Sequence, residues 1–238
     1  MSEINTSADT LFRNGRIYTV NRDQPWASCA AEKAGRFVAV GEEADVESFV
    51  GRDTKVVDLG GRTAMPGIID IHNHIMMGGQ ADLYELRFPS SHSISQIAAA
   101  VKDAAAKAAP GSWIVGGQFG NDLLSKLNTD AAAAELNAAS LGHPVLLRDD
   151  SYHNRWASAE ALRIAGVGAE TQNPVDGEIG RDLESDRLTG LMVEAASGIV
   201  ERALAKAGHY TPEMDRAAIA RSIGVLNSFG VVRRMECS

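Results

Sequence analysis

The sequence predicts an α/β protein in which a small β-rich unit precedes a larger region of alternating helices and strands. Residues 10–64 consist of short apolar segments separated by turn signals. Residues 65–79 hold an apolar run that ends in two histidines, and the segments after residue 90 alternate between Ala-rich and β-branched composition. Such alternation between helix and strand patterns is typical of α/β folds.

Composition limits the classes of function. The chain has 238 residues, 45% of them hydrophobic, which is enough for one or two domains with a sizeable core. A net charge of -8 argues against binding to nucleic acid or to an anionic membrane. No secretory signal is visible, and no apolar run approaches the ~20 residues that span a bilayer, so we expect a cytoplasmic protein. Cys29 and Cys237 are too few for a disulfide framework or a Cys-based zinc site.

The β-rich unit is built from strands and tight turns. Asn14-Gly15 lies between two apolar segments and is a strong hairpin signal. Gly35 separates two further segments, and a strand near residues 55–58 is followed by Gly60-Gly61. One short helix is expected near residues 42–50.

The region after His74 alternates between helices and strands. An amphipathic helix ends at Pro110-Gly111, and a second begins at the capping residues 128–130. Residues 173–191 are polar and are predicted to be turn-rich. The predicted helices cover 94–109, the segment after 130, 158–165, 192–207 and 212–229, and the predicted strands cover 113–118 and 144–149.

The two histidines, His72 and His74, predict a metal site. Alternate residues of a strand point to one face about 6.5–7 Å apart, so their imidazoles project together. Zinc, iron and manganese accept such ligands, and zinc is the commonest choice for hydrolysis. The preceding run Ile68–Ile71 is typical of a buried parallel strand, and active sites of β/α barrels lie at the carboxyl ends of such strands. Asp70 lies on the same face and is expected to orient one imidazole.

Other interpretations of this motif remain open. A bare His-x-His occurs often by chance, in which case the histidines would be structural. The letters "HNH" also match the name of a nuclease class, but those nucleases spread their histidines and asparagine over a longer motif. Pro66-Gly67, the apolar strand and Asp70 favour the metal site.

At this point the sequence resembles a known family. "TAMPGIIDIHNH", preceded by a β-rich segment, resembles the start of the amidohydrolase superfamily. "SWIVGGQF", "HPVLLRDDSYHNRWASAEALRIAGV" and "DGEIGRDLESDRLTGLMVEAA" resemble amidohydrolase family 3, the branch that includes N-substituted formamide deformylases. The resemblance covers nearly the whole chain.

The resemblance implies a division of the chain. Residues 1–64 would form part of a small composite β-sandwich, and residues 65–75 would form the first strand of a metal-dependent (β/α)8 barrel. Residues 76–211 would be a large α/β insertion, and residues 212–238 a helix leading to the second barrel strand. We therefore expect an incomplete barrel, and the ending "RRMECS" is interpreted as a truncation or frameshift.

The resemblance also implies a ligand set. His72 and His74 match the first two metal ligands, and a complete enzyme would hold one or two divalent ions, with zinc expected first. Further ligands, a lysine and two histidines, would lie on later strands together with an aspartate that shuttles protons. We therefore expect no catalytic residue within this chain.

His153 matches a histidine of the insertion that faces the substrate. Glu194 matches an acidic residue to which we assign no role. Ser151 and Tyr152 replace an Asp-Gly pair of the family, and Ser158 replaces an asparagine. We expect these changes to affect substrate contacts and not metal binding.

Three further features have simple structural interpretations. Arg148 and Asp149 are expected to form an ion pair at a strand end, and His143 is expected in a surface turn. Gly116-Gly117 lacks the Gly-x-x-x-x-Gly-Lys pattern, so no phosphate loop is predicted there.

The expected function is hydrolysis of carbon–nitrogen bonds other than peptide bonds, in small amide or N-formyl substrates, by metal-activated water. The alternative is an inactive fragment that binds metal or pairs with a second copy or a complementing C-terminal piece. A metal-dependent deoxyribonuclease is a third possibility, because such enzymes also open with His-x-His. There the motif lies close to the N-terminus, whereas 71 residues precede His72.

Overall fold

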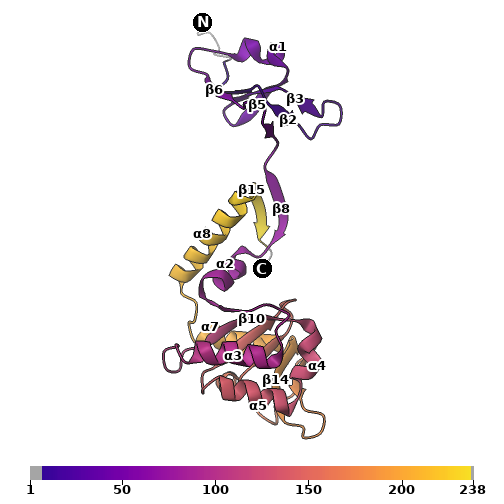
Figure 1. The fold of residues 1–238 in the computed structure, drawn as a ribbon, viewed down its shortest axis with the longest axis vertical. Coiled ribbons are helices and arrows are strands. Elements are labelled where there is room, and N and C mark those ends of the chain that lie inside the picture. The colour runs from indigo at the N-terminus through magenta and orange to yellow at the C-terminus, as the bar shows by residue number, and fades with distance from the viewer. Residues whose placement is uncertain (1–6, 237–238) are drawn as a thin grey trace. The chain divides into compact units, whose positions relative to one another are not determined.

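The computed structural model describes residues 7–236, so Cys237 lies outside the described residues. The chain divides into two compact units. The first comprises residues 1–71 and 229–235, and the second comprises residues 72–228 and 236–238. Figure 1 shows the elements of each unit along the chain.

Two small sheets form the N-terminal part of the first unit. One has the strand order β5-β4-β1-β6, with β1 antiparallel to β4 and parallel to β6. The other has the order β3-β2-β7. The strand-rich prediction for residues 10–64 is confirmed, and the packing of the sheets as a sandwich stays a prediction. The strands are β1 (Thr10–Arg13), β2 (Arg16–Tyr18), β3 (Trp26–Ala27), β4 (Cys29–Lys33), β5 (Arg36–Gly41), β6 (Lys55–Asp58) and β7 (Thr63–Ala64).

The core of this part is small. Leu11 of β1 and Cys29 and Ala31 of β4 pack against Val46. Val46 ends the short helix α1 (Glu43–Val46), which continues as the 3-10 turn η1 (Glu47–Phe49). Asn14, in the turn between β1 and β2, adopts φ 54°. The predicted hairpin at Asn14-Gly15 is wrong, because β1 pairs with β4 and β6 while β2 pairs with β3 and β7, so this turn leads from one sheet into the other.

The strand β8 (Ile68–Asn73) pairs with β15 (Val231–Glu236) in a two-stranded sheet. The strand prediction is confirmed, but the predicted burial is wrong. Ile68, Ile69 and Ile71 are 47%, 58% and 75% exposed. The reason is that, among the described residues, β8 has one neighbouring strand, β15 (Figure 1). Its apolar side chains are therefore left in solvent.

The second unit is organised around a mixed six-stranded sheet of order β13-β14-β12-β11-β10-β9. Strands β9, β10 and β11 are parallel, and the other neighbours are antiparallel. The turns predicted within residues 173–191 are present at 175–176 and 183–185, but the strands β13 and β14, which form a hairpin around the second turn, were not predicted. The strands are β9 (Leu86–Arg87), β10 (Ile114–Phe119), β11 (Val145–Asp149), β12 (Arg155–Ala157), β13 (Gly177–Arg181) and β14 (Leu188–Glu194).

Helices α3 to α5 cover one face of this sheet and α6 and α7 the other, whereas α2 and α8 pack mainly against each other. Ser93, Thr129 and Ser158 cap three of them by accepting hydrogen bonds from backbone N–H groups. The last two helices are α7 (Ser197–Lys206) and α8 (Pro212–Ser228); α7 starts later than predicted because residues 188–194 form β14. The others are α2 (Ile75–Tyr84), α3 (Ile94–Ala105), the 3-10 turn η2 (Asn121–Leu123), α4 (Leu124–Leu127), α5 (Asp130–Ala139) and α6 (Ala159–Ala165).

Alternation along the central strands creates two cores. Val145 and Leu147 of β11 pack with residues of α3, α4 and α5. Leu146, between them, packs on the opposite face with residues of α6 and α7. Successive side chains of a strand point to opposite faces, so one continuous apolar strand serves both cores. The sheet is therefore the middle of three layers.

Ser158 and His143 fasten β11 to α6. The Ser158 hydroxyl donates to the His143 carbonyl oxygen over 3.1 Å and accepts from the Val145 N–H over 2.9 Å. His143, predicted in a surface turn, is only 8% exposed because its ring packs against Ser112, whose carbonyl oxygen lies 2.9 Å from Nδ1. Ser158 is fully buried. Its replacement of the family asparagine therefore affects packing and not substrate contact.

Helices α2 and α8 pack closely against each other. Gly79 of α2 is buried, and a Cβ at this position would overlap the carbonyl oxygen of Ala218. The Gln80 side chain donates to Asp215 over 2.7 Å, and Ser222 donates to the Ile75 carbonyl oxygen over 2.7 Å. Among the described residues, no helix combines the length and apolarity needed to cross a bilayer.

Candidate functional site

His72 and His74 lie at the junction of β8 and α2. Their ring centroids are 5.1 Å apart and the ring planes are nearly perpendicular, at 83°. Both residues are exposed. His74 occupies the N-cap position of α2, but its side chain makes no capping hydrogen bond. The imidazole is therefore not used to hold the helix end.

The pair fits part of a metal site. Two adjacent imidazoles are suitable donors for a divalent ion, and a catalytic zinc uses three protein ligands. Between residues 7 and 236, no group of three or more His, Cys, Asp or Glu side chains is arranged to hold a metal. Asp70, the predicted orienting residue, is half-buried on β8. The metal ligands and the role of Asp70 stay predictions.

A hollow of about 310 Å³ lies beside His74. Its wall carries Asp82, which accepts hydrogen bonds from Arg87 Nη1 and Arg221 Nε, each over 2.6 Å. The bond and charge of Arg221, followed by those of Arg87, hold the pKa of Asp82 below its usual range. Two guanidinium groups share one carboxylate, so this wall of the hollow is cationic. We call this space the His74 hollow.

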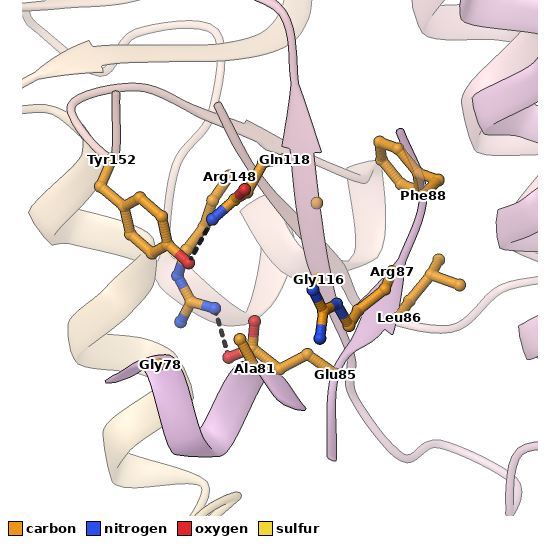
Figure 2. A pocket seen from close by; sticks show the side chains of 11 residues that line it. Gly78, Ala81, Glu85, Leu86, Arg87, Phe88, Gly116, Gln118, Arg148 and Tyr152 are labelled. Carbon is orange, nitrogen blue, oxygen red and sulfur yellow. Dashed lines mark hydrogen bonds and ion pairs between the residues drawn. The ribbon is translucent and has the colours of Figure 1, made fainter. Parts of the chain in front are cut away.

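A second space, the polar pocket, has a volume of about 200 Å³ and shares Gly78 and Arg87 with the His74 hollow. Figure 2 shows its side chains, which come from α2, β9, β10 and the end of β11. Gln118 Nε2 donates to the Tyr152 hydroxyl over 2.9 Å. Arg148 and Glu85 form the buried side of the pocket, with side chains 8% and 5% exposed.

Arg148 belongs to a buried ion network. Its Nη1 lies 2.5 Å from Glu85 and its Nε 3.3 Å from Glu201, which also accepts from Arg155 over 2.7 Å. The predicted pair between Arg148 and Asp149 is therefore wrong. Successive strand residues point to opposite faces, which turns the two side chains apart.

Asp149 has its own partners on the other side of the strand. Its carboxylate accepts from the Asn154 backbone N–H over 3.0 Å, from the Asn154 side chain over 2.8 Å and from Ser151 over 2.6 Å. These bonds shape the loop between β11 and β12. Ser151, one of the departures from the family pattern, therefore has a structural role in this loop.

Electrostatics reinforce the ion network. Burial lowers the pKa of Arg148, but the charges of Glu85 and Glu201 outweigh burial and raise it above the usual range. Burial and then the Glu85 charge raise the pKa of the Tyr210 hydroxyl, which donates to Glu85. Burial alone would raise the pKa of Glu201, but Arg148 and Arg155 lower it. Arg148 and Glu201 therefore stay charged, and the Tyr210 hydroxyl stays neutral, near neutral pH.

His153 and Glu194 meet at the same edge of the sheet. His153 Nδ1 donates to Glu194 Oε2 over 3.0 Å, and the hydrogen bond and charge of Glu194 raise the pKa of His153. The side chains are 64% and 56% exposed. Tyr152 and Glu194 adopt φ values of 62° and 50°, a region that residues other than glycine rarely occupy. Backbone strain of this kind is often retained at functional sites. The substrate contact of His153 stays a prediction.

Sequence reasoning missed Glu85, Glu201 and Tyr210. Each stands alone in a segment without a motif, and the network joins α2, β11, α7 and the segment before α8. A buried arginine requires buried carboxylates. In the sequence, the one sign that Arg148 has buried carboxylate partners is its position on an otherwise apolar strand.

The sequence is similar to known proteins over most of its length. The sequence profile described as "Amidohydrolase family" matches residues 55–237. LONG AFTER FAR-RED 3 of Arabidopsis thaliana is 35% identical over 193 residues, covering 81% of this chain and 32% of that protein. The N-substituted formamide deformylase of Arthrobacter pascens is 30% identical over 196 residues, covering 82% of this chain and 36% of that enzyme.

A solved structure shows the same fold. An uncharacterized metal-dependent hydrolase from Pyrococcus horikoshii aligns with a TM-score of 0.63 at 22% identity, over 96% of this chain and 43% of that chain. The chain spans about a third of the length of the two curated relatives. The profile match covers most of the chain, and two relatives align over four fifths of it. This protein belongs to the amidohydrolase family.

Proposed function

We propose that this chain carries the N-terminal part of a metal-dependent hydrolase that acts on carbon–nitrogen bonds other than peptide bonds. The observation that carries the proposal is the pair of imidazoles, with ring centroids 5.1 Å apart, at the end of β8. Family membership and a relative named as a formamide deformylase support small amide or N-formyl compounds as substrates.

In this proposal His72 and His74 hold a divalent metal, zinc first, and Asp70 orients one of the imidazoles. A bound metal would supply an acidified water, with a pKa near ~7, and would polarise the substrate carbonyl. His153, held by Glu194, would donate a hydrogen bond to the substrate. The proposed organisation is a sandwich part over 1–64, the first barrel strand over 65–75, an insertion over 76–211 and a second barrel segment over 212–238.

A second candidate function is that of a metal-binding module completed by another polypeptide segment or by a second copy. Two adjacent imidazoles favour it, because a catalytic zinc needs at least one further protein ligand. In that case the purified chain would bind metal but would hydrolyse no amide until a complementing segment was added.

Metal analysis tests the assignment. The purified chain is loaded with zinc, passed through a desalting column and analysed for bound metal by plasma mass spectrometry. We expect the double variant His72→Ala/His74→Ala to lose the bound zinc. His153→Ala removes a histidine outside the pair and should retain it. Unchanged zinc content in the double variant would exclude His72 and His74 as ligands.

Hydrolysis is measured separately on N-formyl and simple amide substrates. Turnover that depends on added metal and is lost in His72→Ala supports the hydrolase. Zinc binding without turnover, with turnover restored by a complementing segment, supports the second candidate function.

A further inference from the structure

The turn between β13 and β14 presents a leucine to solvent. Leu183 is 98% exposed, the highest value among the large hydrophobic residues that the structure describes. Glu184, beside it in the sequence, is also exposed and forms no ion pair with another described residue. We call residues 182–187 the Leu183 tip. An apolar side chain that lies fully in water next to an unpaired charge marks a candidate contact surface.

The Leu183 tip is held in one conformation. Asp182 Oδ1 accepts hydrogen bonds from the backbone N–H groups of Glu184 and Ser185, each over 3.0 Å. Asp182 Oδ2 accepts from the backbone N–H of Asp130 in α5, and Arg187 Nε donates to the Asp130 side chain, each over 3.0 Å. A tip that is already ordered loses little conformational entropy when it binds a partner.

A groove of about 460 Å³ lies between α6 and α7. Its apolar lining includes Ile164, which is 41% exposed, together with Ile199 and Ala203. Arg202 and Lys206, one helical turn apart on α7, also line it. Both are exposed, and neither forms an ion pair within residues 7–236. We call this space the α6–α7 groove. It combines an apolar surface with two unpaired positive charges in a chain whose net charge is -8.

The Leu183 tip and the α6–α7 groove are complementary. The groove would remove the Leu183 side chain from water. Glu184 brings a negative charge to the same contact, where Arg202 and Lys206 supply positive charges. We propose that the Leu183 tip of one copy of this chain docks in the α6–α7 groove of a second copy. This contact goes beyond the proposed hydrolysis and uses no residue of the metal site.

A second copy is the occupant because every chain carries both surfaces. The tip is anchored to α5, which covers the face of the sheet opposite α6 and α7, so it is held away from the groove of its own chain. The carboxylates of α6 and α7 are already paired, Glu160 with Arg163 and Glu201 with two buried arginines. The charges of Arg202 and Lys206 therefore remain for a partner.

The test separates the two surfaces. Leu183→Ser loses the tip but keeps the groove, whereas Arg202→Glu/Lys206→Glu loses the groove charges but keeps the tip. All three residues are exposed, so both variants are expected to fold. The ¹⁵N-labelled Leu183→Ser chain is titrated with the unlabelled Arg202→Glu/Lys206→Glu chain and followed by two-dimensional NMR, which detects weak contacts. We expect saturable shifts at the backbone amides of Ile164 and Ala203. No saturable shift would overturn the proposal and leave the groove to an occupant other than this chain.

A matched pair of unlabelled partners locates the contact. Adding Leu183→Ser to the unlabelled chain should weaken binding at least about tenfold, as the loss of a buried leucine side chain implies. Adding Val175→Ser instead removes another apolar side chain, 86% exposed and before the opposite end of β13, and should leave the affinity unchanged. Equal affinity with and without Leu183 would contradict docking through this tip.

The charges are tested in the same titration. Glu184→Gln in the unlabelled chain should weaken binding several-fold at low salt and by less at high salt, because exposed charges are screened. An affinity that is unchanged by Glu184→Gln at low salt would show that Glu184 does not face Arg202 and Lys206, which would overturn the proposed orientation.

Discussion

His153 donates a hydrogen bond to Glu194 over 3.0 Å, although 41 residues separate the two in the sequence. The imidazole comes from the loop after β11 and the carboxylate from the end of β14. Ser197 also donates to the His153 carbonyl oxygen over 2.9 Å, which fixes the backbone of the loop. Because Glu194 occupies Nδ1, the other ring nitrogen of His153 is the one available to a ligand.

Removing the Glu194 charge should lower the pKa of His153. The hydrogen bond and charge of Glu194 are the main causes of the raised pKa, so in Glu194→Gln it should fall toward 6.5. The measurement is a pH titration of the His153 ring signals by NMR. Glu178→Gln, an exposed substitution on the neighbouring strand β13, should leave the titration unchanged. An equal pKa in wild type and Glu194→Gln would show that the pair does not form in solution.

The same pair has a small effect on stability, with a defined pH dependence. A raised pKa of His153 in the folded state means that its contribution is present below pH 6.5 and is lost as pH rises through the folded pKa. The difference in thermal midpoint between wild type and Glu194→Gln should therefore shrink above neutral pH. The effect is small because both side chains are exposed. A difference that grows at alkaline pH would contradict this sign.

Substitutions in the buried ion network should destabilise the protein far more than substitutions in the exposed His153–Glu194 pair. Arg148→Met leaves Glu85 buried without its cation, and removing one partner of a buried pair costs about 3–5 kcal/mol. Urea unfolding of the two proteins measures the difference. Arg163→Met is the matched control, because its pair with Glu160 is exposed on α6 and should contribute little. Equal losses in the two variants would show that burial does not strengthen the Arg148 network.

Acid should weaken this network through Glu201. Arg148 and Arg155 hold the pKa of Glu201 below 4.5, so its contribution is present above that pH and is lost as pH falls through the lower folded value. The difference in urea midpoint between wild type and Glu201→Gln should therefore shrink on acidification from pH 7 to about pH 3. A difference that stays constant over this range would mean that Glu201 does not titrate in the folded protein as inferred.

The local elements were largely predictable from the sequence. Leu146 and its apolar neighbours predicted β11, and the capping residues 128–130 predicted where α5 begins. The hairpin of β13 and β14 was missed because glycines and charged residues interrupt the apolar pattern of residues 173–191. The hairpin is stabilised by Ile179 and Met192, which pack with residues of α6 and α7. These contacts are distant in the sequence, so no local pattern predicts them.

The candidate site could be predicted only where its residues lie within one sequence motif. His72 and His74 are two residues apart in the sequence, so the short backbone path from the end of β8 to the start of α2 keeps their rings close. Glu85 and Arg148 lie 63 residues apart, and their pairing depends on how α2 approaches the sheet. No single segment of the sequence predicts that Glu85 and Arg148 pair. The family resemblance located His153 and Glu194, but their hydrogen bond is a result of the sheet topology.

The last prediction concerns two adjacent glycines of α2 that should respond in opposite ways to the same substitution. At Gly79 a Cβ would overlap the backbone of Ala218, which cannot move without separating α2 from α8, so Gly79→Ala should destabilise the protein by about 1–3 kcal/mol. At Gly78 no atom lies within 4 Å of the added carbon, so Gly78→Ala should stabilise the helix by about 0.5–1 kcal/mol. Each variant is the control for the other, because both change helix propensity equally. Thermal unfolding should place their midpoints on opposite sides of the wild-type value, and midpoints that shift together would mean that α2 and α8 do not pack this closely.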